Sequence, residues 1–387
     1  MDADVTERAQ CLLRGKIDWD LLLWKTWRHR VAPLLYPNLT AIGLESIPST
    51  ILDQLRYHVE INAVRNLLLA SHLINSLSLL TAYNLPAVPF KGPVLAASIY
   101  HGLERRESGD LDILVHQKDI VRARDILMAH GYEPKEQGDG PWHDAYLRYT
   151  YESQLVHPDD EVCIDLHWRL TGNAFPFRLR PEYIWQHLQP VTLLGTTLHT
   201  LQPDDLLLYL CVHGAKHFWC KLGWICDIAE LVRNQPAIVS ESLIARAQAL
   251  GSERLLFLGL VLAQRLLGIP LPDGLSQQLQ RNPTVMSLAE QMQLGLFDQT
   301  EEPLERTEAL ILKFRMRERF RDRGRQSLHW LTQMLRPNQL DRALMTLPTS
   351  CSFLYYWLRP IRLMRTYGMA PFRQLRRIPA VLLETLR

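Results

Sequence analysis

The segment GDLDILV, residues 109–115, constrains the fold most, because it places two aspartates in an otherwise apolar strand pattern. Side chains at positions i and i+2 of a strand lie on one face of a sheet, so Asp110 and Asp112 project together while the apolar residues between them face a core. Two carboxylates this close repel each other unless a cation lies between them. The segment therefore predicts a strand with one core face and one cation-binding face.

A second strand pattern, VCIDLHWRL at residues 162–170, supplies a third carboxylate. Asp165 stands between two apolar neighbours, and His167 shares its face. Three aspartates that converge from neighbouring strands are a common arrangement for one or two Mg²⁺ ions, since hard divalent cations prefer oxygen ligands. A lone D-x-D pattern can equally end a strand or cap a turn. With the third carboxylate, we treat Asp110, Asp112 and Asp165 as candidate catalytic and metal-binding residues.

The turn FKG, residues 90–92, lies upstream of these strands, with Gly92 eighteen residues before the first aspartate. A glycine between a strand and a helix lets a phosphate approach the backbone N–H groups of the helix N-terminus, and Lys91 can add a positive charge. Arg106 stands four residues before Asp110. We expect it either to contact a phosphate or to pair with a carboxylate at the end of a strand.

The order of segments predicts an α+β fold with a small mixed β-sheet core and large N- and C-terminal helical additions. A long helical run from residue 51 ends near Asn84 and Pro86, and strands and helices then alternate. Pro203 is suited to the first turn of a new helical region. The expected regions are an N-terminal helical region at 1–84, the sheet core at 85–200, a helical substrate-side domain at 201–297, and a basic C-terminal helical segment at 298–387.

Charge is distributed unevenly along the chain. Residues 313–387 hold 16 Lys and Arg against 4 Asp and Glu, although the whole chain has a formal net charge of only +2. A basic segment suggests an anionic partner such as nucleic acid or an anionic surface, or it is simply a set of solvated helix faces. The six cysteines show no framework spacing, and no uncharged apolar run approaches the length of a membrane span. We therefore expect a cytoplasmic protein with no integral membrane segment.

Residues 88–115, followed by a helix and the sequence GYEP, resemble the metal-binding core of the nucleotidyltransferase superfamily that includes DNA polymerase β. More narrowly, they are similar to a bacterial branch usually described as uncharacterised nucleotidyltransferases. That branch has a K-G turn, an R-x-x-x-D-x-D strand and a later D-x-H-W strand. The similarity continues at residues 210–231 and 347–368. Where most of the superfamily has a G-S or G-G turn, this chain has K-G, as the branch does.

This resemblance implies a magnesium-dependent enzyme, with Mn²⁺ as an alternative ion. The expected reaction moves a nucleoside monophosphate from an NTP, for example ATP, to an unidentified acceptor and releases pyrophosphate. Asp110 and Asp112 would hold both metal ions, and Asp165 would complete the second site and activate the acceptor oxygen. The residues expected to contact the nucleotide are Lys91, Gly92, Arg106 and Gly109. His167 would orient Asp165, touch the acceptor or lie behind the metal ligands.

A pair of histidines, His213 and His217, stands four residues apart and should share one face of a helix. The pair could face a nucleotide or an acceptor together with Asp227, or it could simply pack. It could also bind Zn²⁺ with Asp227 or a nearby cysteine, although no compact zinc motif is present. Lys216 and Lys221 favour an anion-facing surface here. Trp219 and Trp224 are expected in the core.

Two other functions remain open from the sequence. One is a catalytically silent module that senses nucleotides or binds a partner, against which the three retained aspartates argue. The other is a nucleic-acid-binding protein that uses the basic C-terminal segment, where arginines alternate from Arg315 to Arg325. The acceptor, whether a small molecule, a protein or an RNA, is not indicated by any motif, and neither are the base preference and the oligomeric state.

Overall fold

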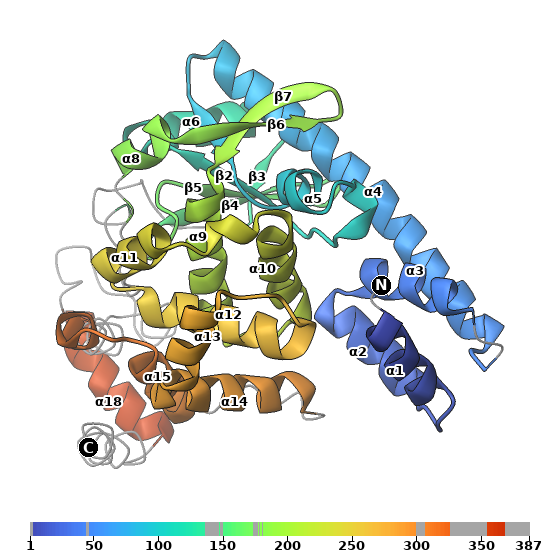
Figure 1. The fold of residues 1–387 in the computed structure, drawn as a ribbon. Coiled ribbons are helices and arrows are strands. Elements are labelled where there is room, and N and C mark those ends of the chain that lie inside the picture. The colour runs from blue at the N-terminus through green and yellow to red at the C-terminus, as the bar shows by residue number, and fades with distance from the viewer. Residues whose placement is uncertain are drawn as a thin grey trace. The chain divides into compact units, whose positions relative to one another are not determined.

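The structure is a computed structural model that describes residues 3–43, 46–135, 147, 150–172, 177, 179, 181–298, 306–325 and 354–367. The chain divides into two compact units. Unit 1 comprises Met1–Asn173 and Phe177–Phe297, and unit 2 comprises Ala174–Pro176 and Asp298–Arg387. The fold is α+β, as the sequence predicts, with a small mixed sheet and helical additions at both ends (Figure 1).

Four helices precede the sheet in unit 1, namely α1 (Ala3–Leu13), α2 (Trp19–His29), α3 (Ala32–Ile42) and α4 (Ser49–Ala82). α2 begins where the Asp18 side chain accepts a hydrogen bond from the backbone N–H of Leu21. It ends at Arg30, whose left-handed backbone turns the chain into α3. The predicted long helix is α4, and it ends just before Asn84, which also has a positive φ.

The five-stranded sheet has the order β1-β2-β5-β4-β3. Its strands are β1 (Ala87–Pro89), β2 (Leu111–Val115), β3 (Glu133–Pro134), β4 (Glu152–His157) and β5 (Val162–His167). β2 and β5 run parallel, while the other neighbours are antiparallel. The predicted strands around the two carboxylate motifs are therefore confirmed, and they are adjacent in the sheet.

One face of the sheet is the core of unit 1. Leu111, Ile113, Ile164 and Leu166 are fully buried there. α4 and α6 (Ile120–Ala129) cover this face, with further buried side chains that include Leu69, Leu73, Leu77, Leu80, Ala123 and Leu127. Burying each such aliphatic side chain contributes roughly 1.5–3 kcal/mol. Figure 1 shows α4 and α6 on one side of the sheet, and α9 and α10 on the other.

A two-stranded hairpin, β6 (Leu188–Leu193) and β7 (Thr196–Leu201), lies outside this sheet. The sequence pattern did not predict it, because its turn residues are Leu194 and Gly195 rather than a typical Asn-Gly or Asp-Gly pair. Both nevertheless have a positive φ, as a type I′ hairpin turn requires. The Thr200 hydroxyl donates to the carbonyl of Pro89 at 2.7 Å, which links the hairpin to β1.

The rest of unit 1 is mainly helical, as predicted for the region after Pro203. Its further helices are α5 (Pro93–Ile99), α8 (Pro181–Gln186), α9 (Pro203–Lys216), α10 (Leu222–Asn234), α11 (Glu241–Leu250), α12 (Glu253–Leu267), α13 (Asp273–Gln280) and α14 (Pro283–Phe297), with short 3-10 turns η1 (Leu103–Arg105), η2 (Gln117–Asp119) and η3 (Pro236–Ile238). Unit 2 contains α15 (Arg306–Arg315) and α18 (Tyr355–Tyr367). Residues 326–353 and 368–387, much of the basic segment, lie outside the described residues.

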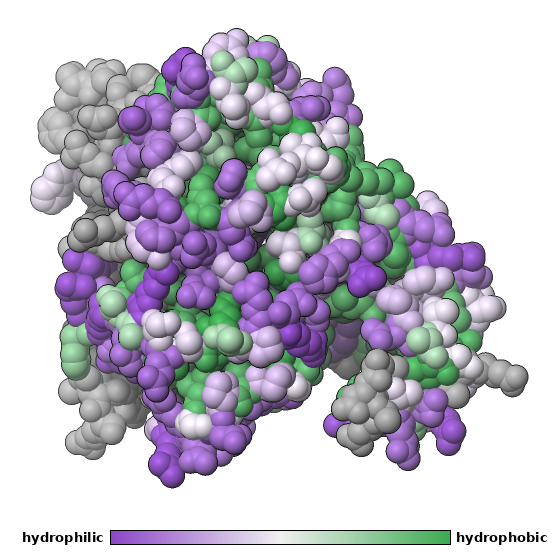
Figure 2. All heavy atoms as spheres, turned by 45° about the horizontal axis from the view of Figure 1, so that its top comes forward, coloured by the Kyte–Doolittle hydropathy of each residue, from purple (hydrophilic) through white to green (hydrophobic). Residues whose placement is uncertain are grey.

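By length and composition alone, α4 is long and apolar enough to cross a membrane, the one such helix in the described part of the chain. Of its most apolar window, 39% is buried within the fold. Its core-facing leucines pack against the sheet, whereas Tyr57, Ile61 and Val64 are exposed. On the face of the molecule seen in Figure 2, hydrophilic residues surround smaller hydrophobic patches. In this fold α4 is a core helix of unit 1.

α4 also holds the loop that leads into β2. Asn66 is fully buried, and its side-chain amide donates to the carbonyl oxygens of Leu103 at 2.7 Å and Arg106 at 2.6 Å. Asn62 donates to Glu104 and to Arg106, both at 3.3 Å. These two asparagines satisfy the loop carbonyls that no strand or helix pairs.

Replacing Asn66 with alanine removes both short hydrogen bonds and leaves buried carbonyls without their donor. We expect Asn66→Ala to lower the free energy of unfolding by about 1–3 kcal/mol. Chemical denaturation followed by circular dichroism measures this change. Asn75→Ala, at an exposed position of the same helix, is the matched control. Equal losses in the two variants would contradict the proposed role of Asn66 in holding the loop.

Candidate active site

The parallel register of β2 and β5 brings two carboxylates together. Asp112 is paired with Asp165 across the two strands, so their side chains share the polar face of the sheet. His167 lies two residues further along β5 on the same face. One ligand atom from each of Asp112, Asp165 and His167 lies within 4.8 Å of the others. Glu152 and Gln154 of β4 are paired with His167 and Asp165, which extends the polar face.

Asp112 is the most buried member, and two positive or polar groups surround it. Its Oδ1 lies 2.7 Å from Lys91 Nζ and accepts a hydrogen bond from His167 Nε2 at 3.1 Å. Burial by itself favours the neutral acid, but the Lys91 ammonium and the His167 hydrogen bond together hold the pKa of Asp112 well below its usual range. His167 therefore contacts Asp112, whereas the sequence suggested Asp165. Asp112 is an ionised carboxylate at neutral pH.

Asp165 has the opposite electrostatic setting. Burial and repulsion by the Asp112 carboxylate raise the pKa of Asp165 to about 6. The Gln154 side-chain amide donates to Asp165 Oδ1 at 3.0 Å and fixes the orientation of the carboxylate. Two neighbouring carboxylates with pKa values shifted in opposite directions are characteristic of functional sites.

Asp110 stands one residue before β2 and lies outside this three-residue cluster. It lines the same pocket as Asp112 and Asp165, and its charge contributes to raising the pKa of Asp165. All three aspartates selected from the sequence therefore line one pocket, and the tightest group of possible ligand atoms contains His167 rather than Asp110. The side-chain alternation that placed Asp110 beside Asp112 holds strictly only inside a strand.

Gly92 connects the K-G turn to the aspartate strand. It has φ +63°, and a Cβ at this position would lie 2.8 Å from the carbonyl oxygen of Asp110. Any side chain would force the two segments apart. Gly109 is constrained from another side, since a Cβ there would lie 3.3 Å from both terminal nitrogens of Arg30. Both glycines keep the backbone accessible at the pocket.

The donor set fits a divalent cation. Asp112 Oδ2 is buried and has no hydrogen-bond partner among the described residues, an arrangement that is costly unless a ligand completes it. Two carboxylates and one imidazole within a few ångströms suit a hard divalent ion. The cluster of Asp112, Asp165 and His167 is the one three-residue ligand group found in the described ranges.

Arg106 pairs with a carboxylate of the helical region. Its Nε and Nη2 donate to Asp227 Oδ1 at 2.7 Å and Oδ2 at 3.0 Å, a bidentate ion pair between the loop before β2 and α10. The Tyr100 hydroxyl also donates to Asp227 Oδ1 at 2.9 Å. Asp227 is buried. Burial alone would lower the pKa of Arg106, but the ion pair with Asp227 raises it above its ordinary value. Of the two roles left open for Arg106, the structure has the carboxylate pairing, but with a helix rather than a strand end.

Aromatic rings line the helical side of the pocket. The rings of His213 and His217 lie 4.8 Å apart, and each lies about 5 Å from the Trp224 ring, at 5.1 and 5.2 Å. Burial and neighbouring positive charges lower the pKa of His213 well below its ordinary value, so its imidazole is neutral. No described residue joins the two histidines in a three-ligand cluster, which removes support for the zinc alternative. Trp219 is buried as expected, whereas Trp224 is a pocket residue.

The pocket has a volume of about 260 Å³ and contains all eleven site residues selected from the sequence. Several further lining residues come from segments that no motif marked; they are Arg30, Tyr151, Glu152, Gln154 and Tyr209. Glu107 also lines the pocket, inside the motif that runs from Arg106 to Asp112. Arg30 reaches the pocket from the end of α2, and the only trace of this contact in the sequence is the glycine at position 109. Lys216 and Lys221 also line it, as the sequence suggested.

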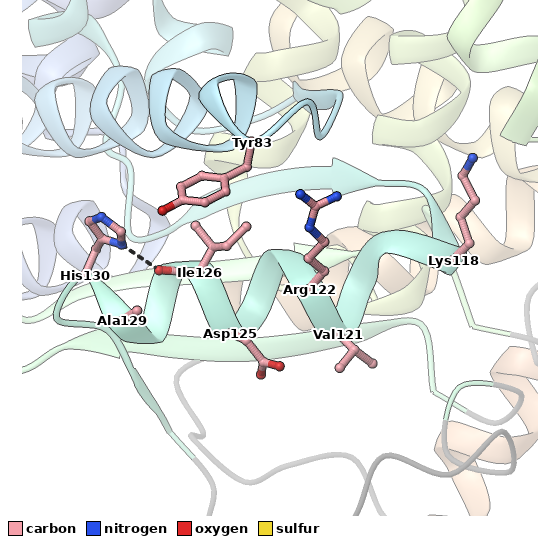
Figure 3. Close-up of a pocket in the computed structure, with 8 residues that line it drawn as sticks. All are labelled: Tyr83, Lys118, Val121, Arg122, Asp125, Ile126, Ala129 and His130. Carbon is pink, nitrogen blue, oxygen red and sulfur yellow. Dashed lines mark hydrogen bonds between the residues drawn. The ribbon is translucent and has the colours of Figure 1, made fainter.

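A second pocket lies along α6 and the end of α4 (Figure 3). Its lining residues include Tyr83, Lys118, Arg122, Asp125 and His130. It has one carboxylate and no cluster of metal ligands. We therefore take the pocket of Asp112 and Asp165 as the candidate site.

The family of the chain follows from a comparison with known proteins. A family model described as "Uncharacterised nucleotidyltransferase" matches residues 15–268, a range that contains every pocket residue from Arg30 to Asp227. A solved structure of an antigenic nucleotidyltransferase-like protein from Paracoccidioides brasiliensis is 13% identical, with a TM-score of 0.33, and the alignment covers 57% of this chain and 92% of that chain. The search of curated proteins found no match.

The ion pair of Arg106 and Asp227 predicts a large effect on stability. Asp227→Ala leaves a buried guanidinium without its partner, so we expect the free energy of unfolding to fall by about 3–5 kcal/mol. Glu230→Ala, on the same helix, removes a more exposed pair with Arg233 and should cost less than about 1 kcal/mol. Urea denaturation of both variants tests this difference, and similar losses would contradict it.

The pKa of Asp165 predicts how cation binding depends on pH. Since the pKa is raised to about 6, protons compete with the cation below that value, and binding of Mn²⁺ should release a proton. We expect the affinity to rise by up to about tenfold per pH unit from pH 5 to 6 and to level off above 7. Calorimetric titration with Mn²⁺ across this range measures it. Asp165→Asn should abolish the step, and an unchanged step in that variant would refute the assignment.

Proposed function

The chain belongs to the family of uncharacterised nucleotidyltransferases, and on this basis we propose that its pocket transfers a nucleoside monophosphate from an NTP to an acceptor and releases pyrophosphate. The observation that supports this best is the division of charge within one pocket. Carboxylates lie on the sheet side, at Asp110, Asp112 and Asp165, while Lys216 and Lys221 lie on the helical side. A metal-bound triphosphate is the kind of ligand that needs both.

On the sheet side, Asp112 and Asp165 would hold Mg²⁺, with Mn²⁺ as an alternative and Asp110 as a further oxygen ligand. A divalent ion bound there would neutralise charge on the phosphates and polarise the reacting phosphoryl group. Gln154 keeps Asp165 oriented, and His167 keeps Asp112 oriented. These contacts make the carboxylates rigid before any ligand arrives, which reduces the cost of binding.

On the helical side, Arg30, Lys216 and Lys221 would contact the triphosphate. The described residues provide no carboxylate ion pair for any of the three, unlike Arg106, which is held by Asp227. Burial lowers the pKa of Lys216, and its Nζ hydrogen-bonds to the Tyr151 hydroxyl. Lys91 and the backbone at Gly92 and Gly109 complete this proposed phosphate site. Arg106 would hold the loop before β2 in place through its ion pair with Asp227, and it would not contact the phosphates.

Asp165 would be the proton acceptor of the reaction. An acceptor hydroxyl would transfer its proton to an Asp165 carboxylate oxygen while its own oxygen forms a bond to the α-phosphorus. The bond from the α-phosphorus to the bridging oxygen of pyrophosphate would break, and the basic residues would stabilise the leaving group.

The aromatic wall would bind the nucleoside. The rings of Trp224, His213 and His217 lie beside Lys216 and Lys221, and the neutral imidazole of His213 can both donate and accept hydrogen bonds. Stacking on an indole ring tolerates any base. The acceptor would enter from the side of Glu152 and Gln154.

A nucleotide-binding protein without catalysis is the second candidate. The observation that favours it is the ion pair of Lys91 with Asp112, which satisfies one carboxylate oxygen with a side chain of the protein itself. Transfer of label from an NTP separates the two candidates, because the silent protein would bind nucleotide and transfer nothing.

Nucleotidyl transfer should depend on the carboxylates. We expect purified protein with α-³²P-labelled NTPs and Mg²⁺ or Mn²⁺ to label itself or a component of a cell extract. Asp112→Asn and Asp165→Asn should each reduce the rate by about a hundredfold or more, since charge stabilisation by a metal is worth several kcal/mol. Undiminished transfer in a variant with Asp110→Ala and Asp112→Ala would refute the proposal.

Binding of the nucleotide should depend on the helical lysines. We expect Lys216→Met and Lys221→Met to weaken binding of a non-hydrolysable ATP analogue by about tenfold each, as charged hydrogen bonds to phosphate are lost. Fluorescence of a labelled analogue measures the affinity. Lys118→Met, in the pocket of Figure 3, should leave it unchanged. An equal loss in all three variants would indicate a general charge effect and contradict a phosphate site.

A further inference from the structure

Lys91 lies where a cation is needed. Its Nζ is 2.7 Å from Asp112 Oδ1, and the side chains of Lys91 and Asp112 are only 12% and 1% exposed. The ammonium also lies over the Tyr209 ring, 5.7 Å from its centroid. The charge of Asp112 raises the pKa of Lys91 despite its burial, so the lysine is protonated here. The protein thus carries an internal cation on the central carboxylate of the site.

A free divalent ion must compete with this ammonium. An ion held by Asp112 and Asp165 would lie within a few ångströms of Lys91 Nζ, and two positive charges so close in a buried site repel strongly. The ion can bind Asp112 well only if the ammonium moves away. Among the described residues Asp112 is the carboxylate that forms an ion pair with Lys91, and Asp110 acts on it only from beyond ion-pair distance. A new anionic partner is therefore needed to keep the displaced ammonium paired.

A triphosphate supplies that partner. The side chain of Lys91 is a flexible four-carbon stem with a point charge, and it can turn from Asp112 to a phosphate oxygen without moving the backbone at Gly92. The Lys91 ammonium would then pair with a phosphate oxygen as the divalent ion binds the Asp112 carboxylate. Both positive charges keep an anionic partner throughout the exchange.

We propose that Lys91 is a tethered counter-ion that weakens binding of the free divalent ion and lets it bind tightly together with a triphosphate, so that the ligand of the site is the preformed metal–NTP complex. The proposal rests on the proposed function, since it assumes an NTP at this pocket. The ion pair of Lys91 with Asp112 thereby has a role in the binding of the substrate.

The test is a titration with Mn²⁺ at pH 8, with free Mn²⁺ followed by electron paramagnetic resonance and no nucleotide present. We expect Lys91→Met to bind Mn²⁺ about tenfold or more tightly than the unmodified protein, because removing the ammonium leaves a buried carboxylate without a counter-ion. Lys91→Arg keeps the charge and should bind as weakly as the unmodified protein. Lys118→Met, equal in charge change but in the pocket of Figure 3, should have no effect.

The same titration with a non-hydrolysable ATP analogue completes the test. The unmodified protein should then take up the metal–nucleotide complex, and Lys91→Met should take it up less well than it takes up free Mn²⁺. If Lys91→Met does not fold, as judged by its thermal transition, Lys91→Gln replaces it. Tight binding of free Mn²⁺ by the unmodified protein, or no gain in the neutral variants, would overturn the proposal.

A double variant with Asp112→Asn and Asp165→Asn separates this inference from the proposed function. If it binds the metal–nucleotide complex as well as the unmodified protein, the pocket is not the nucleotide site and the proposed function fails. If it loses that binding while Lys91→Met shows no gain for free Mn²⁺, the nucleotide site stands and only the role of Lys91 is wrong.

Discussion

The parallel pairing of β2 with β5 is the constraint on which the rest of the site depends. Their register sets Asp112 opposite Asp165, and a shift of one residue would turn one of the two carboxylates into the core. The apolar residues next to the two aspartates in the strands, such as Leu111 and Ile164, fix that register because they are fully buried under α4 and α6. The same packing that stabilises the sheet therefore forces two acidic side chains together on its other face.

Two helices hold the loop that carries Asp110. Asn66 of α4 donates to the carbonyls of the loop, and Asp227 of α10 binds Arg106 in the same loop. One helix covers the core face of the sheet and the other faces the carboxylates. The loop is thus fixed from both sides, and two of the buried charges of the pocket have an oppositely charged partner. Arg106 is neutralised by Asp227, and Asp112 is neutralised by Lys91.

Local patterns predicted the fold class and the strands with the carboxylates, because alternation within a strand and helix-ending residues are local signals. The eleven residues selected from the sequence line one pocket. Local patterns could not predict contacts between segments that are far apart in the sequence. Arg30 reaches the pocket across a turn in the left-handed conformation, and nothing in its neighbourhood marks it. The partner of Arg106 stands 121 residues away. Asp110 lies outside the tightest cluster because β2 begins one residue later, and such boundaries are weakly encoded. The hairpin β6–β7 lacks typical turn residues.

The central claim is that Asp112 and Asp165 bind a divalent ion together with a triphosphate. Its most direct test is a crystal structure with Mn²⁺ and a non-hydrolysable NTP, with manganese located by anomalous scattering. The account predicts a manganese peak in contact with oxygens of both aspartates, and Lys91 Nζ moved from its 2.7 Å contact with Asp112 to a phosphate oxygen. A nucleotide bound elsewhere, or manganese at the aspartates with Lys91 still on Asp112, would contradict it.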